Sequence, residues 1–145
     1  MRRNYFKTIA LLSLILACLG CSKKKEQAKS PLLNVSGTIE IDPDLLKYAR
    51  ASDTVFVIAR PATGGPPVAV ERLQGKNYPL IFKLTEKNIM IHQNTLDFPL
   101  NLTVRVDKDG NAMTKDPGDL AGAYEKNPVS LHAENITLRI QEILK

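Results

Sequence analysis

The chain has 145 residues, 43% of them hydrophobic, and a formal net charge of +5 at pH 7. This length fits one domain that can bury a core without disulfides. Most of the excess positive charge lies in residues 1–30, and residues 31–145 hold 13 basic and 14 acidic side chains. With no Trp and 6% aromatic residues, we expect no nucleic-acid-binding surface.

Residues 1–20 have the pattern of a lipoprotein signal peptide. Arg2, Arg3 and Lys7 precede an apolar stretch over residues 8–19. That stretch is too short for a permanent transmembrane helix and is typical of a cleaved signal. An uncleaved anchor and an ordinary secreted protein are the alternatives.

The signal ends at Gly20 and Cys21, which resembles a bacterial lipoprotein signal in which the cysteine is lipidated (palmitate is one such lipid) and becomes the first mature residue. Where that pattern has Leu, three positions before the lipidated cysteine, this chain has Cys18, and cleavage before Cys18 is a second interpretation. Cys21 is favoured because the polar residues begin directly after it. Ser22 resembles the signal for export to the outer membrane rather than the inner one.

Residues 21–33 are interpreted as a lipidated, lysine-rich flexible tether. Residues 22–30 read SKKKEQAKS and hold too few apolar side chains to order. The lysines could contact anionic lipid, or the segment could be a solvated linker. Because both cysteines precede the folded part, that part has no disulfide and no cysteine chemistry.

Residues 34–145 predict an all-β fold. Short apolar or alternating segments are separated by Gly, Pro, Asn and Asp, and no long helical period is found. A short helical segment is expected within residues 44–51, residues 88–98 are ambiguous, and residues 116–127 are expected to be a loop. The predicted strands are 35–41, 54–59, 68–73, 80–84, 100–106, 129–131 and 136–144.

About seven short strands with turns at this spacing indicate a mainly antiparallel β-sandwich. Residues 54–59 form an unbroken β-branched and aromatic run, which predicts a central strand buried on both faces. The predicted core contains Ile39, Val55, Val57, Val70, Leu80, Phe82, Leu102, Val104 and Ile140.

Few residues are arranged for chemistry. Met90, His92, Met113 and His132 could supply soft copper ligands, but no ligand spacing supports such a site. Asp107, Asp109 and Asn111 resemble the start of a calcium loop, but the Asp-Gly pair alone predicts a turn. No GxSxG, HExxH or phosphate-loop pattern occurs. We therefore expect no enzyme activity, no metal and no cofactor.

Arg60 follows the apolar run and needs an anionic partner or a path to water. An internal ion pair with an acid such as Asp53 is the favoured interpretation, and a partner's carboxylate is the alternative.

Two pairs of segments carry a family resemblance. The first is DTVFVIAR at 53–60 with GPPVAVER at 65–72, and the second is VRVDKDGNAM at 104–113 with PGDLAG at 117–122. Together, over residues 34–145, they resemble the C-terminal periplasmic domain of the CcmI/CycH proteins of cytochrome c maturation. The family usually places this domain after transmembrane helices and tetratricopeptide repeats, where this chain has the predicted lipid anchor.

The resemblance implies an immunoglobulin-like sandwich and a non-enzymatic accessory role in c-type cytochrome biogenesis. The protein would be anchored in the membrane by lipid, face the periplasm, and bind apocytochrome c or a haem-ligation protein. The alternative is a small periplasmic ligand- or metal-binding lipoprotein that shares only the fold.

The two Gly/Pro-rich loops, residues 61–67 and 117–122, are the predicted partner-binding edge. Proline lowers the entropy lost on docking, glycine lets another backbone approach, and arginine and aspartate offer polar contacts. Alternatively, the loops only shape tight corners of the sandwich. The predicted partner-binding residues are Arg60, Gly65, Pro66, Pro67, Arg72, Gly118 and Asp119.

Overall fold

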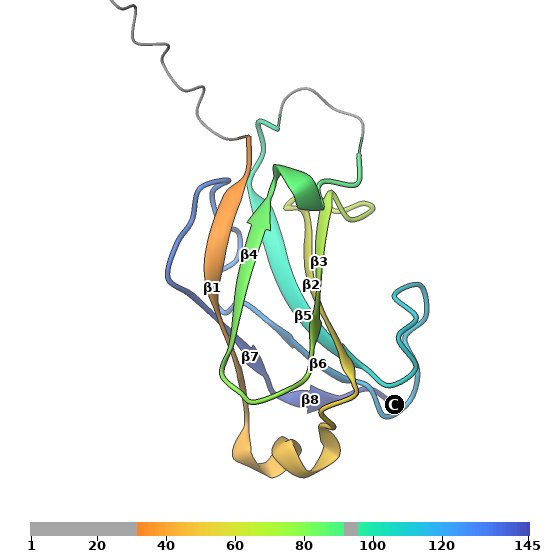
Figure 1. Cartoon of the computed structure of the whole chain (residues 1–145). Helices are drawn as coiled ribbons and strands as arrows, with labels where there is room; N and C mark the ends of the chain where they lie inside the picture. Colours follow the sequence, from red (N-terminus) through yellow and green to blue (C-terminus); the bar gives the residue numbers. More distant parts are fainter. Residues whose placement is uncertain (1–31, 92–95) are drawn as a thin grey trace, which may run out of the picture.

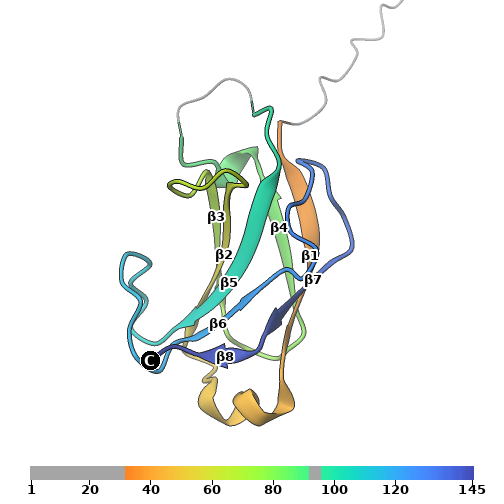
Figure 2. The same cartoon turned by 180° about the vertical axis from the view of Figure 1, so that it is seen from behind.

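The structure, a computed structural model, describes residues 32–91 and 96–145. They form two sheets packed face to face (Figures 1 and 2). One sheet has the strand order β4-β1-β7 and the other β3-β2-β5-β6-β8. Neighbouring strands are antiparallel except β1 and β7, which are parallel. The predicted β-sandwich is confirmed, with eight strands in place of about seven.

The strands and the two short 3-10 helices alternate with turns along the chain. The helix predicted within residues 44–51 is present as η1, and part of the ambiguous 88–98 segment follows η2. The elements are β1 (Asn34–Ile41), η1 (Pro43–Tyr48), β2 (Thr54–Pro61), β3 (Ala69–Gln74), β4 (Leu80–Thr85), η2 (Glu86–Asn88), β5 (Leu100–Asp107), β6 (Leu120–Ala123), β7 (Ile136–Ile140) and β8 (Glu142–Ile143).

Strand β2 lies in the middle of the five-stranded sheet, between β3 and β5. Its first six residues are all buried, so both faces of the strand are covered. Val55 and Val57 face the core, while Phe56 and Ile58 lie on the outer face and are only 4% and 7% exposed. The predicted buried central strand is confirmed.

The backbone of β7 lies very close to β1, its neighbour in the same sheet, and to β6 of the other sheet. A Cβ atom at Gly37 would lie 1.9 Å from the carbonyl oxygen of Ile136, and one at Gly122 would lie 1.8 Å from that of Arg139. Only glycine leaves room for the backbone of β7 at these two points. After Ile140 the chain continues into β8, which pairs with β6. This corner joins the two sheets.

The opposite corner, between β3 and β4, is held by side chains. The Glu71 carboxylate accepts a hydrogen bond of 2.7 Å from the main-chain N–H of Lys83. Burial raises the pKa of Glu71, and the hydrogen bond from Lys83 partly opposes that rise. Just before the start of β3, the N–H of Met90 donates to the carbonyl of Val68 at 2.9 Å. These contacts occupy hydrogen-bonding groups of the two edge strands, which leaves less edge for a partner strand.

The core lies between the two sheets and includes seven of the nine predicted core residues. Val70 is only half-buried, because it is Ala69 that points inward at this end of β3, and Leu80 is half-buried at the first residue of β4. Leu33, which the sequence places in the tether, is fully buried in the core.

Two sequence-based expectations at the end of the chain are wrong. Residues 116–127, expected to be a loop, contain β6, which pairs with both β5 and β8. Residues 129–131, expected to be a strand, form only an isolated bridge between Val129 and Leu100. The strand at β6 escaped prediction because three of its four residues are Ala or Gly, which have low β propensity, and the close approach of β7 requires glycine at position 122.

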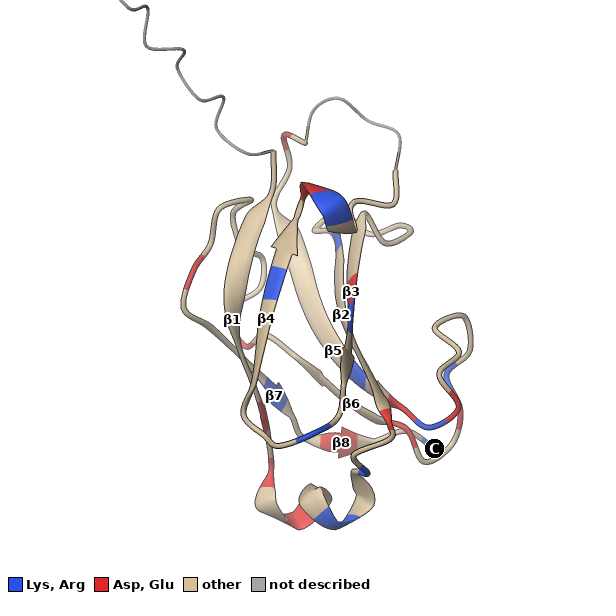
Figure 3. Ribbon diagram, in the orientation of Figure 1, with Lys and Arg blue, Asp and Glu red and all other residues tan. Residues whose placement is uncertain are grey.

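Charged residues gather toward the lower end of the sandwich in Figure 3, around η1, β7, β8 and the 108–119 loop. Among the described residues, no helix is long and apolar enough to cross a membrane. Cys18 and Cys21, with the predicted signal and most of the tether, lie outside the described residues.

Candidate functional site

The first predicted binding loop, residues 61–67, projects from the end of the sandwich where β2 stops. Gly65 and Pro66 are exposed, and Arg60 and Pro67 are half-buried. Gly64 and Gly65 have φ values of +91° and +115°, and a side chain at either position would meet no atom within 4 Å. The glycines therefore serve the turn, and the surface of the loop is open to solvent.

The second predicted loop lies at the other end of the sandwich and has a structural role. Asp119 is 1% exposed. Its carboxylate accepts hydrogen bonds from the main-chain N–H groups of Lys108 at 3.1 Å and Asp116 at 3.3 Å. Residues 117–119 are the end of a longer loop, residues 108–119, which Asp119 closes from inside. A partner cannot reach the carboxylate of Asp119 without opening this loop.

Arg72 lies on the outer face of the five-stranded sheet, opposite Phe56, and not beside the first loop. Its Nη2 lies 3.5 Å from Thr54 Oγ1, and its guanidinium lies 6.0 Å from the centroid of the Phe56 ring. The guanidinium of Arg105 lies 5.7 Å from the same centroid. Phe56 therefore owes part of its burial to two arginines on the outer face of the sheet.

The seven predicted partner-binding residues thus do not form one surface. Arg60 also lacks its expected internal partner, because Asp53 precedes β2 and Arg60 lies near the far end of that strand. Asp53 instead forms an ion pair with Lys108, at 2.6 Å. The structure places Arg60, Gly65, Pro66 and Pro67 at one end and Arg72, Gly118 and Asp119 toward the other.

A buried ion pair lies under the second loop. Arg105 Nη2 is 3.2 Å from Asp107 Oδ2, and the two side chains are 6% and 0% exposed. Asp107 Oδ1 accepts hydrogen bonds from the N–H groups of Gly110 at 2.6 Å and Asn111 at 2.9 Å. Burial raises the pKa of the Asp107 carboxyl, and its hydrogen bond with the Asp109 side chain raises it further. The predicted turn is confirmed, and this carboxylate accepts hydrogen bonds from the backbone of that turn.

The residues considered for copper are not brought together. Met90 lies beside the start of β3, and Met113 lies in the 108–119 loop at the other end of the sandwich. His92 lies outside the described residues. In the ranges 32–91 and 96–145, no three His, Cys, Asp or Glu side chains gather as a metal site.

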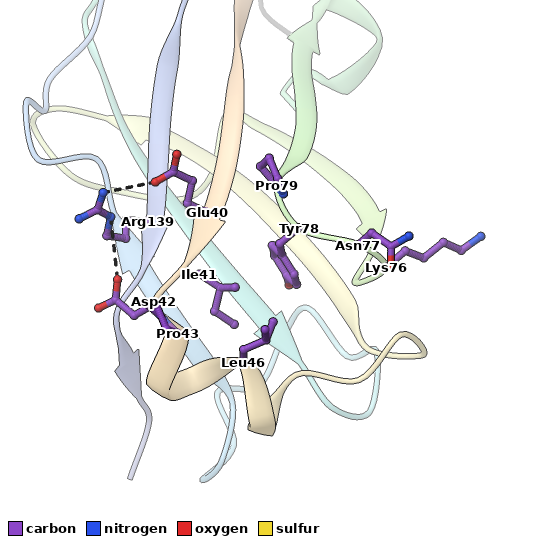
Figure 4. A pocket seen from close by; sticks show the side chains of 10 residues that line it. All are labelled: Glu40, Ile41, Asp42, Pro43, Leu46, Lys76, Asn77, Tyr78, Pro79 and Arg139. Carbon is purple, nitrogen blue, oxygen red and sulfur yellow. Dashed lines mark hydrogen bonds and ion pairs between the residues drawn. The ribbon is translucent and has the colours of Figure 1, made fainter.

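A groove of about 720 Å³ lies between η1 and the turn that leads into β4 (Figure 4). Ligand pockets in proteins have volumes of this order. Its apolar lining, which we call the floor, comes from the end of β1, from η1 and from the 78–79 turn. The floor residues are Ile41, Pro43, Leu46, Tyr78 and Pro79.

The groove has charged sides. On one side Arg139 Nη2 lies 3.3 Å from Glu40 Oε2, and its Nε lies 3.9 Å from Asp42 Oδ1. All three side chains are 41% to 49% exposed, so solvent screens these pairs and they add little stability. On the other side lie Asn77 and Lys76, and the Lys76 side chain extends outward (Figure 4).

Tyr78 forms part of the floor, and its hydroxyl is enclosed. No hydrogen-bond partner for this hydroxyl exists among the described residues. Burial, reinforced by the negative charge of Asp53, raises the pKa of Tyr78 to about 12. The side chain therefore stays neutral at physiological pH and contributes its ring to the apolar surface.

The groove suits binding rather than catalysis. Its charged side chains are paired with one another or point to solvent, and Tyr78 stays neutral. An apolar floor between polar sides is the usual anatomy of a contact surface. Sequence reasoning missed it because the floor residues are up to 38 positions apart. The structure marks this surface by Leu46, a large apolar side chain that the short helix η1 leaves 52% exposed.

Comparisons with known proteins bear on the fold. Residues 35–141 match the family model described as the cytochrome c-type biogenesis protein H Ig-like domain. An 86-residue stretch is 40% identical to the cytochrome c-type biogenesis protein CycH of Pseudomonas aeruginosa, and covers 55% of this chain and 21% of that protein. An 89-residue stretch is 32% identical to an uncharacterized protein of Aquifex aeolicus, and covers 61% of this chain and 59% of that protein.

The chain therefore spans about a fifth of the CycH protein and less than two thirds of the Aquifex protein. Among solved structures, an alternative pilotin from the type II secretion system of Vibrio cholerae matches with a TM-score of 0.47 and 14% identity. That match covers 75% of this chain and 96% of the pilotin. It is too weak to support an inference.

Proposed function

The chain belongs to the family of cytochrome c-type biogenesis protein H Ig-like domains, and from this membership we propose that it serves c-type cytochrome biogenesis as a non-enzymatic protein-binding domain. One relative, CycH, supports a role in this process, because that protein is named for cytochrome c-type biogenesis. The partner would be apocytochrome c or a protein that ligates haem to it.

The groove is the observation that carries the binding role. The groove has the volume of a binding pocket and an apolar floor. Leu46, in that floor, is exposed, and no packing role explains why an apolar side chain stands there. The loop 61–67, with Arg60, Gly65, Pro66 and Pro67, is a second contact surface in this proposal. Its exposed turn is free for a partner. Arg72 is better explained by its contacts with Thr54 and Phe56, and Gly118 and Asp119 by the architecture of the second loop.

The protein would act in the periplasm, attached to a membrane by a lipid on Cys21, with the outer membrane favoured over the inner one. Residues 1–21 support the lipid anchor through their signal pattern, and Ser22 supports the outer membrane. Lipidation needs the thiol of Cys21, so Cys21→Ser should leave an unprocessed precursor that takes up no radioactive palmitate. If Cys21→Ser is processed and labelled while Cys18→Ser is not, the mature chain begins at Cys18.

The test of the process is deletion of the gene, followed by haem staining of c-type cytochromes in membrane and periplasmic fractions. The proposal expects lower yields with normal apocytochrome transcripts, and recovery when the full chain is restored. Unchanged c-type cytochromes in the deletion strain would refute a role in their biogenesis.

A further inference from the structure

Two features of the groove point to the chemistry of its occupant: an apolar floor that solvent reaches, and an unpaired cation beside it. We propose that the groove holds a segment of a partner polypeptide that places an apolar side chain on Ile41, Leu46 and Tyr78 and a carboxylate against Lys76. This inference rests on the proposed protein-binding function and names the kind of segment bound.

The floor argues for an apolar side chain. Leu46 is 52% exposed, although it lies in the only helix at this end of the described sandwich. Figure 4 shows the side chains of Ile41, Leu46 and Tyr78 turned toward the same space. An apolar side chain placed there would remove several apolar surfaces from water at once, and this is how anchor residues contribute to interfaces.

The charges around the floor argue for a carboxylate. The single guanidinium of Arg139 is already shared between Glu40 and Asp42. Lys76, on the opposite side, forms no ion pair with any residue of the described ranges. A carboxylate from the occupant would pair with Lys76, the one cation of the groove that lacks an anion. Such charge complementarity selects among partners more than it adds affinity.

The position of the groove argues for a partner away from the lipid surface. Strand β1 begins at Asn34, at the upper end of the sandwich in Figure 1, and the groove lies beyond its other end, at Ile41. Eight strand residues span about 26 Å, at roughly 3.3 Å each. If the chain is held at the membrane through residues that precede β1, the groove opens on the side that faces soluble proteins.

The experiment uses the full chain and two short fluorescein-labelled peptides that share a Leu-Leu-Phe centre. The peptides differ in one flanking residue, glutamate in one and lysine in the other, and binding is followed by fluorescence anisotropy. We expect the glutamate peptide to bind about threefold more tightly, which is the effect expected of one exposed ion pair. Lys76→Glu should reverse this preference. The matched control Lys83→Glu, on the outer face of β4 away from the groove, should leave it unchanged.

Leu46→Glu should abolish the binding of both peptides, and Ile81→Glu, at an 80% exposed position outside the groove, should not. The inference is wrong if the two peptides bind equally, if Lys76→Glu leaves the preference as it was, or if Leu46→Glu binds normally. It is also wrong if sedimentation shows a dimer that Leu46→Glu dissociates, because the occupant would then be a second copy. Binding of the chain to anionic vesicles through Leu46 would equally overturn it.

Failure of this inference can be told apart from failure of the proposed function. If c-type cytochromes are lost in the deletion strain but both peptide predictions fail, the chain serves the process through another surface. If the deletion has no effect on cytochromes while the peptides behave as expected, the groove binds proteins of another process.

Discussion

The carboxylate of Asp119 accepts a hydrogen bond of 3.1 Å from the main-chain N–H of Lys108, eleven positions earlier in the chain. This bond closes the 108–119 loop at its base. The side chain of the same Lys108 forms an ion pair with Asp53, which directly precedes β2. A residue that the sequence suggested for partner binding is thus part of the structural frame.

Asp119→Ala should lower the free energy of unfolding by about 1–3 kcal/mol, because the N–H groups of Lys108 and Asp116 lose their acceptor. Asp119→Asn keeps one carbonyl oxygen and should cost less. Urea unfolding of the three proteins measures the difference. Equal stability of Asp119→Ala and the native protein would show that the loop does not depend on this carboxylate.

Gly122→Ala should be among the most damaging single changes, since the new Cβ would lie 1.8 Å from the carbonyl oxygen of Arg139. The backbone of β6 or β7 must move, at a cost of about 3 kcal/mol or more. Gly75→Ala is the control, because its Cβ would approach backbone oxygens only to 3.1 Å. Thermal melts that rank the two variants in the opposite order would contradict the close crossing of β7.

Tyr78→Phe should change how stability depends on alkaline pH. Because the pKa of Tyr78 is raised from 10.0 to about 12, the folded chain holds this proton more tightly than the unfolded chain does. Stability from this group is therefore complete below pH 10 and is lost as pH rises toward 12. Tyr78→Phe removes that part of the decline, whereas Tyr48→Phe, at an exposed position, should retain it. Denaturant titrations between pH 9 and pH 11.5 would test this, and parallel declines in the native protein and Tyr78→Phe would refute it.

Asn127 should contribute to the stability of the second half of the chain nearly as much as a short strand does. Its Oδ1 accepts from the N–H of Leu102 at 2.8 Å, and its Nδ2 donates to the carbonyl of the same residue at 2.9 Å. Asn127→Ala should cost about 1–3 kcal/mol. Asn127→Asp, which keeps the acceptor and loses the donor, should fall between. Hydrogen exchange at the amide of Leu102 should quicken in Asn127→Ala, and unchanged exchange would show that another group protects it.

Local sequence patterns predicted most of the sandwich. The β-branched run of β2 and the strict alternation of β5 are consequences of burial on one or both faces, and both strands appear where expected. Strand β6 was missed because Ala and Gly have low β propensity, and Gly122 is dictated by the close approach of a distant strand, β7. The expected ion pair of Arg60 with Asp53 is absent because Asp53 precedes β2 and Arg60 lies near the other end of that strand.

The candidate groove was beyond sequence reasoning. Ile41, Leu46 and Tyr78 come from a strand end, a 3-10 helix and a turn, and they meet only because β1 and β4 pair in the same sheet. The Gly/Pro-rich loops attracted attention in the sequence because Gly and Pro stand out locally. The structure gives the 61–67 loop an open surface and gives the 108–119 loop a buried network of hydrogen bonds.

The most direct test of the whole account is the yield of haem-stained c-type cytochromes in cells whose only copy of the gene carries Leu46→Glu, measured beside cells that carry Ile81→Glu. Both positions are exposed, so both proteins should reach normal levels and melt at the native temperature. The account predicts that Leu46→Glu reduces c-type cytochromes toward the level of the deletion strain while Ile81→Glu leaves them unchanged. Normal cytochrome yield with Leu46→Glu, in cells where the deletion abolishes it, would contradict the assignment of the groove as the partner site.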